Sequence, residues 1–257
     1  MTLSEQIVYA MFKPSRYKEM IKLKRKKSVL FIVVLMFVLG IVTFAVPTGA
    51  YITGFGGFEK LFTQNMGNIK YQDGALSIDK PFEMIVGGAH ILIDTETETV
   101  TDEKMNKSGA YFAIGSKNMR LAIVSDRKVS DYKTISLTGL LPDGLDNNML
   151  VSYIPGIYMY LVIIFISTCI GFFIKYGFFA LVFSICINSM NKRMELGLTY
   201  GQVFMLCFYG QTLGMILVNF NAAIGLMPAI IVSLVGFFIS INMITMSVAI
   251  IHQGKQV

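Results

Sequence analysis

Hydrophobic positions are gathered into two long blocks of this chain, and an ordinary mixed sequence separates them. The first block is residues 28–50 (SVLFIVVLMFVLGIVTFAVPTGA), and the second lies within residues 151–257. An apolar stretch of about 20 residues is long enough to cross a bilayer as a helix. The pattern predicts an α-helical polytopic membrane protein with about four transmembrane helices and an inserted domain at residues 51–150.

The C-terminal block, residues 151–257, divides into three predicted spans. These lie near residues 153–174, 201–220 and 226–251. A further apolar run, residues 176–190, follows Lys175 with almost no turn sequence, so it is either an embedded continuation of the preceding helix or a fifth span. The continuation is favoured, because about 15 residues are short for a crossing and because Lys192 and Arg193 then stay on the side of the basic N-terminus.

The inserted segment, residues 51–150, alternates between apolar and polar positions in short runs, which is typical of strands. Asp73-Gly74 separates two such runs and predicts a hairpin turn. Further strand candidates follow it, namely FEMIV, HILIDT, AYFAIG, RLAIVS and KTISLTG. We expect a mixed α/β, β-rich domain with about five strands and one covering helix.

Charge is distributed unevenly along the chain, and its sign predicts an orientation. The formal net charge is +6, and residues 1–27 hold eight Lys or Arg against two Glu. Residues 51–150 hold 13 of the 16 acidic residues and 10 of the 22 basic ones. The positive-inside rule therefore places the N-terminus in the cytoplasm and residues 51–150 outside the cell membrane. Residues 1–27 are then either a basic amphipathic segment on the inner leaflet or a flank that only orients the first helix.

Sequence motifs of enzymes and of metal sites are missing from the chain. It has no HExxH, GxSxG or GxxxxGK[ST] motif, and its predicted spans contain neither Asp nor Glu. Its three cysteines lack CxxC spacing, and a lone strand histidine such as His90 is more often structural than catalytic. The acidic run from Asp94 to Glu103 lacks the loop pattern of a calcium site. We expect no catalytic residue, no cofactor, no metal and no nucleic-acid partner.

Polar side chains in or beside the spans are the remaining candidates for function. Amides at membrane depth need partners, so they are expected either to bind other helices or to line a substrate path. The turn around residues 191–202 is expected to face the cytoplasm, where it offers a coupling surface for a transport ATPase. The candidate intramembrane polar or coupling positions are Lys175, Asn188, Lys192, Arg193, Tyr200, Gln202, Gln211, Asn219 and Asn242.

Three stretches carry a resemblance to a known family. They are IKYQDGALSI, FEMIVGGAHILIDT and ELGLTYGQVFMLCFYGQTLGMIL, together with the basic N-terminus and the span after it. Over nearly its whole length the chain resembles the bacterial membrane family called domain of unknown function 1189, and the last stretch also resembles the Yip-type membrane proteins. The resemblance implies a shared architecture, no established activity and no catalytic residues. Annotations of some family members are tied to maltodextrin utilisation, which implies an envelope or uptake accessory role.

These features favour a non-enzymatic integral membrane protein of the bacterial cell envelope. Its extracytoplasmic domain is expected to act in an accessory, scaffold or sensing role. The expected partners are the lipid bilayer, an unknown membrane or envelope protein and a second copy of the chain. The alternatives are a membrane subunit or accessory of a transporter, with sugar uptake as one role, and an intramembrane enzyme that depends on His90.

Overall fold

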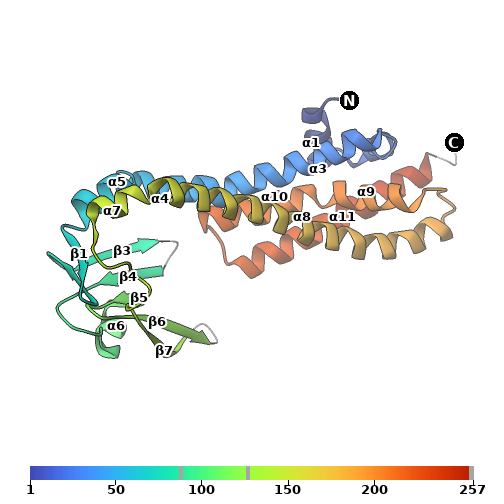
Figure 1. Cartoon of the computed structure of the whole chain (residues 1–257). Helices are drawn as coiled ribbons and strands as arrows, with labels where there is room; N and C mark the ends of the chain where they lie inside the picture. Colours follow the sequence, from blue (N-terminus) through green and yellow to red (C-terminus); the bar gives the residue numbers. More distant parts are fainter. Residues whose placement is uncertain (87–88, 126–127, 255–257) are drawn as a thin grey trace. The chain divides into compact units, whose positions relative to one another are not determined.

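The computed structural model describes residues 1–86, 89–125 and 128–254, and the chain divides into two compact units (Figure 1). The helical unit consists of Met1–Thr48 and Leu161–Val257, and the sheet unit consists of Gly49–Tyr160. The sheet unit is therefore inserted between two parts of the helical unit. This division fits the predicted helical membrane protein with an inserted β-rich domain.

Four helical segments of the described chain are long and apolar enough to cross a membrane, as a multi-pass membrane protein requires. The first, Arg25–Gly54, contains α3 (Arg25–Gly40), one π-helical turn (Ile41–Ala45) and α4 (Val46–Gly54). The second is α8 (Ile154–Arg193). The third, Tyr200–Ile224, contains α9 (Tyr200–Gly210) and α10 (Thr212–Ile224), and the fourth is α11 (Ala229–Gln253).

Helix α8 settles how the run at residues 176–190 is folded. It continues through Lys175 without a turn for 40 residues, so the run is part of one helix and not a separate fifth span. At 1.5 Å per residue such a helix is about 60 Å long, whereas the hydrocarbon core of a bilayer is about 30 Å thick. Part of α8 therefore extends beyond the hydrocarbon.

The N-terminal segment is folded against the helical unit. It contains α1 (Leu3–Phe12), a 3₁₀ turn (Pro14–Arg16) and α2 (Tyr17–Met20). Ala10, Tyr17 and Met20 are fully buried in the same hydrophobic cluster as Tyr209 of α9. The Tyr17 hydroxyl donates a hydrogen bond of 2.6 Å to the carbonyl of Ala10. Part of the apolar surface of this segment is thus covered by protein, while Val8 and Phe12 stay exposed. The sequence predicted an inner-leaflet segment or a simple flank, and neither interpretation includes this packing.

The sheet unit contains two sheets, where the sequence predicts one. Strands β1 (Ile69–Gln72), β2 (Ala75–Ile78) and β8 (Leu145–Asp146) form a three-stranded sheet in the order β2-β1-β8. Asp73 and Gly74 join β1 to β2 with positive φ angles of 52° and 76°, so the predicted hairpin turn is confirmed. The pairing of β8 was missed, because a strand of two residues has no detectable alternation.

The second sheet of this unit has five strands and is covered by one helix. Its order is β3-β4-β5-β6-β7, with β4 and β5 parallel and the other neighbours antiparallel. The strands are β3 (Phe82–Val86), β4 (Ala89–Ile93), β5 (Ala110–Ile114), β6 (Asn118–Ser125) and β7 (Lys128–Ser136). Helix α6 (Asp102–Ser108) lies in the crossover from β4 to β5 and buries Met105 against Leu92 and Ala113. Short helices α5 (Phe58–Lys60) and α7 (Asn147–Ser152) and a π-helical turn (Leu61–Asn65) complete the unit.

Candidate functional site

The third candidate span is divided at Gln211 into α9 and α10, and the helical hydrogen bonds from Gln211 to Cys207 and from Met215 to Gln211 continue through this residue. Gln211 has φ −89° and ψ −4°, and only 3% of it is exposed. Its Nε2 donates a hydrogen bond of 3.1 Å to the carbonyl of Tyr176 on α8. Polar groups at membrane depth must find partners inside the protein, and this bond gives the amide of Gln211 such a partner. This hydrogen bond therefore joins α8 to the junction of α9 and α10.

Tyr176 of α8 contacts two parts of the third candidate span, Gln211 at the junction of α9 and α10 and Asn219 on α10. Its carbonyl accepts the hydrogen bond from Gln211, and its hydroxyl accepts one from Nδ2 of Asn219 on α10. The same Nδ2 donates to the carbonyl of Met215 at 2.7 Å. Lys175 adds a positive charge, with its Nζ at 5.2 Å from the centre of the Tyr176 ring. Lys175, Tyr176, Gln211 and Asn219 are hereafter called the polar cluster.

A cavity of about 170 Å³ lies beside the polar cluster and is lined by Lys175, Tyr176 and Gln211. Its other walls come from aromatic residues of α8 and α11 and from the small residues at which α10 meets α11. No acidic side chain lines it, and the described spans contain no Asp or Glu. The arrangement suits a small neutral or anionic group and offers no carboxylate for a proton relay.

The remaining predicted positions do not join the polar cluster. Tyr200 lies within hydrogen-bond distance of Ser184, with 3.0 Å between their hydroxyl oxygens, and Gln202 completes the capping box of Thr199 at the start of α9. Asn188 is half-buried on α8. The other three are exposed on their helices: Lys192, Arg193 and Asn242.

Two further asparagines brace the loops of the helical unit. Asn191 donates to the carbonyl of Leu198 at 2.9 Å and accepts from the amide of Leu198 at 3.1 Å. Asn221 makes the same pair of bonds with Met227, at 3.0 and 2.9 Å. The side-chain amide of Asn191 therefore stabilises the turn around residues 191–202.

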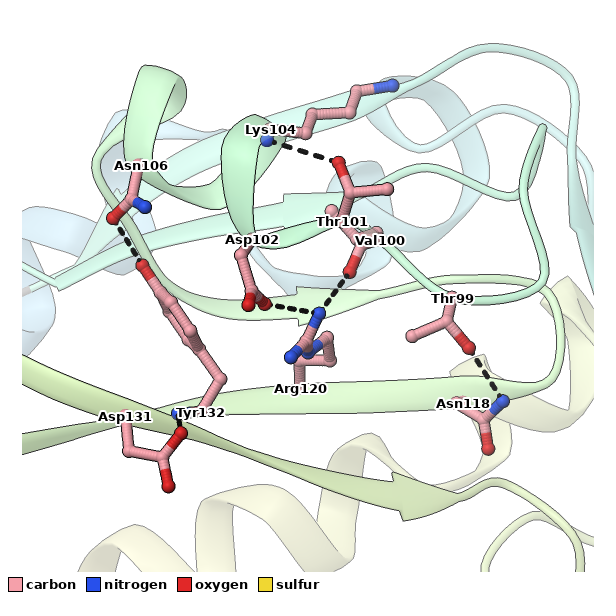
Figure 2. Close-up of polar contacts among 10 residues, drawn as sticks. All are labelled: Thr99, Val100, Thr101, Asp102, Lys104, Asn106, Asn118, Arg120, Asp131 and Tyr132. Atoms are coloured by element: carbon pink, nitrogen blue, oxygen red, sulfur yellow. Dashed lines mark hydrogen bonds and ion pairs between the residues drawn. The ribbon is translucent and has the colours of Figure 1, made fainter.

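Three acidic residues of the described sheet unit, Asp94, Glu98 and Asp102, form ion pairs with Lys or Arg, and Figure 2 shows the pair of Asp102 with Arg120. Arg120 donates to Asp102 at 2.5 Å and to the carbonyl of Val100 at 3.1 Å, so it fixes the start of α6 to strand β6. Asp94 is fully buried and pairs with Lys104. Of the carboxylates considered as calcium ligands, Asp94, Glu98 and Asp102 are thus held in ion pairs.

His90 also has structural contacts. Its Nδ1 lies 2.5 Å from the carbonyl of Ser108, at the end of α6, and its Nε2 lies 3.4 Å from a carboxylate oxygen of Glu83 on β3. The side chain thereby links strand β4 to the neighbouring strand and to the covering helix, which is the structural role expected for a lone strand histidine.

One face of the five-stranded sheet carries a row of apolar side chains. Met84, Ile91, Phe112 and Leu121 are direct neighbours across β3, β4, β5 and β6 in the observed register. All four are only partly buried, and none belongs to the hydrophobic clusters of the unit. Ile85, the next residue on β3, points to the opposite face and is 65% exposed. These four residues are hereafter called the apolar row.

Comparison with known proteins gives a family and no activity. The model of a family described as "Protein of unknown function (DUF1189)" matches residues 5–250. No curated protein and no solved structure matches the chain significantly. The matched residues include the complete sheet unit and nearly all of the helical unit.

Proposed function

The chain belongs to the DUF1189 family, and on that premise we propose that it is a non-enzymatic, membrane-anchored protein whose sheet unit binds a protein of the cell envelope. The four candidate spans supply the anchor. The apolar row supplies the binding surface. This role includes scaffold and sensing functions, because both begin with a partner held at the membrane.

The apolar row is the observation that carries the proposal. Cross-strand neighbours normally stabilise a sheet by packing under a covering layer. In this unit Leu92 and Ala113, on the opposite face, are covered by α6, whereas Phe112 and Leu121 are only partly buried. Neighbouring apolar groups that stay partly accessible to solvent are suited to an interaction surface, and Met and Phe are enriched in protein interfaces. A protein partner with a complementary apolar segment fits this surface.

The unpaired edge of strand β3 adds a second mode of contact. In the described part of the sheet, β3 pairs with β4 on one side only. An edge strand presents free backbone donors and acceptors, to which an extended peptide can add as a further strand. Because Met84 belongs to β3, a partner strand there would lie beside the apolar row.

A photocrosslinking residue at Met84 tests the proposal, and the same residue at Ile85 is the matched control. The two positions are adjacent on β3 and face opposite sides of the sheet. We expect a discrete crosslinked product from position 84 in living cells and none from position 85. The proposal fails if position 84 gives no product, or if both positions give the same one.

The polar cluster and the cavity beside it support a second candidate function, a membrane subunit or accessory of a transporter. Polar and charged side chains that gather near a cavity between spans are typical of substrate paths in membrane proteins. Lys175 and the absence of acidic lining favour an anionic or neutral solute over a cation. This role needs a transport ATPase that binds near the exposed Lys192 and Arg193, whereas envelope binding through the sheet unit does not.

A further inference from the structure

A second and larger cavity of the helical unit lies between the N-terminal segment, α3, α8 and α9. Its volume is about 640 Å³, which is within the range of about 300–1,000 Å³ found for small-molecule sites. Its two ends differ in chemistry. The residues that form most of its apolar wall are Val29, Ile32, Val33, Phe173, Phe204 and Phe208.

The polar groups of this cavity come from the first turns of two helices. Arg25 and Ser28 begin α3, and Thr199 and Gln202 begin α9. Helix α3 has no side-chain cap and neither helix has an acidic residue in its first turn, so the partial positive charge of each N-terminus is not neutralised by a carboxylate there. No acidic side chain lines the cavity. The polar end is therefore suited to an anion.

Basic residues surround Arg25 in the sequence and extend this positive end. Lys22, Lys24, Lys26 and Lys27 are all exposed. Arg25 differs from them because it lines the cavity. A guanidinium group binds phosphate oxygens with a planar pair of donors, which a lysine ammonium does not provide.

The position of the cavity along the spans indicates where its ligand comes from. Arg25 and Tyr200 are the first residues of two candidate spans, so the polar end of the cavity lies where these spans begin. The apolar wall follows from there along α3 and α9 into the spans. A ligand that matches this lining has a charged end at the membrane surface and an apolar end in the hydrocarbon. We propose that the cavity binds one anionic phospholipid of the bilayer, with its phosphate at Arg25 and its acyl chain along the wall of Val29, Ile32 and Phe208.

Two glycines of α8 provide a matched pair for the test. Gly177 lines the cavity, and a Cβ placed on it has no atom within 4 Å. Gly177→Leu therefore puts a side chain into the cavity without a backbone clash. Gly171 lies on the same helix, is equally open and does not line the cavity, so Gly171→Leu is its control. Arg25→Gln removes the charge of the polar end, and Lys26→Gln removes a neighbouring charge that does not line the cavity.

The measurement is native mass spectrometry of the full chain, purified with an equal mixture of phosphatidylglycerol and phosphatidylcholine. We expect the wild-type chain to retain one phosphatidylglycerol. Arg25→Gln and Gly177→Leu are expected to lower that retention at least tenfold, while Lys26→Gln and Gly171→Leu retain it. Equal retention of phosphatidylcholine, or wild-type retention by Gly177→Leu, would overturn the proposal.

A thermal unfolding series separates lipid binding from folding and from binding of a free phosphate. Phosphatidylglycerol is expected to raise the Tm of the wild-type chain and of Gly171→Leu, but not that of Gly177→Leu or Arg25→Gln. Without anionic lipid, the Tm of Gly177→Leu should equal or exceed that of the wild-type chain, because leucine is a better helix former than glycine. If Gly177→Leu does not fold, the comparison of Arg25→Gln with its control Lys26→Gln tests the proposal. Stabilisation by glycerol phosphate equal to that by the lipid would contradict the role of the apolar wall.

Discussion

Tyr17 is the residue that fixes the N-terminal segment to the helical unit. It has no exposed surface, and its hydroxyl donates to Ala10 within the segment and lies 3.4 Å from the carbonyl of Tyr209 on α9. Burial raises the pKa of Tyr17 above its ordinary value, because the phenolate would lose its hydration. The folded chain therefore holds the Tyr17 proton at pH values where the unfolded chain has released it.

This difference in proton affinity predicts an alkaline loss of stability. Above about pH 10, the ordinary pKa of tyrosine, the unfolded chain binds fewer protons at this site than the folded chain, so the free energy of unfolding falls as the pH rises. The contribution of Tyr17 is complete below about pH 10. We expect Tyr17→Phe to be less stable at neutral pH, because a buried hydrogen bond is lost, but to lose less stability between pH 9 and about pH 11. Chemical denaturation at several pH values measures both effects, and identical pH slopes for the two chains would refute the assignment.

Part of the polar cluster was predicted from residue types alone. Lys175, Gln211 and Asn219 were predicted as candidates because charged and amide side chains are costly in lipid. Tyr176 was missed, because an aromatic residue in an apolar run has the pattern of an ordinary core residue. Its role depends on a carbonyl and a hydroxyl that contact two different parts of the third span, which no local pattern encodes. The adjacent Lys175 was the one sequence feature that could have indicated a role for Tyr176.

At the scale of elements, the contact of α10 with α11 depends on small residues. A Cβ placed on Gly214 would lie 2.5 Å from the Ser240 hydroxyl oxygen and would also overlap the carbonyl of Gly236. Gly210 makes a similarly close approach to Ile244. The spacing of Gly210 and Gly214 thus serves packing within one chain, since both glycines meet α11.

Gly214→Ala is therefore expected to force α10 and α11 apart. Overpacking of this kind costs about 1–3 kcal/mol of the free energy of unfolding. Gly171→Ala on α8 adds the same methyl group to open space and should be neutral or stabilising by up to about 1 kcal/mol, because alanine favours helix. Unfolding of both purified variants in a mild detergent with increasing dodecyl sulfate gives the comparison. Equal stabilities would show that the close contact is unimportant.

Elements with a long periodic pattern were predicted from the sequence. Contacts between segments that lie far apart in the chain were missed. The four apolar helices and the hairpin at Asp73-Gly74 follow from local patterns, whereas helix α6 over the larger sheet begins in a stretch whose polar composition predicted a break, so its position was missed. The pairing of β1 with β8 joins residues that are more than 70 positions apart, as in Tyr71 with Leu145, and a two-residue strand leaves no pattern. The packing of the N-terminal segment was missed for the same reason, since its partner Tyr209 is 192 residues from Tyr17.

At the scale of the whole molecule, the charges of the two units differ in sign. The basic residues of the helical unit gather in the N-terminal segment and at the end of α8, whereas the segment at residues 51–150 holds 13 of the 16 acidic residues. We propose that all four candidate spans cross the membrane, which places the two termini on the same side. The positive-inside rule then supports cytoplasmic termini and an external sheet unit, as binding to an envelope protein requires.

Labelling of single cysteines with a membrane-impermeant maleimide tests this orientation most directly. In a chain with Cys169, Cys186 and Cys207 replaced by alanine, one cysteine is placed at Lys107 on α6 or at Lys192 near the end of α8, both exposed positions. We expect the cysteine at position 107 to react in intact spheroplasts and the one at position 192 to react only after lysis. Labelling of position 192 in intact spheroplasts, with position 107 protected until lysis, would contradict an external sheet unit.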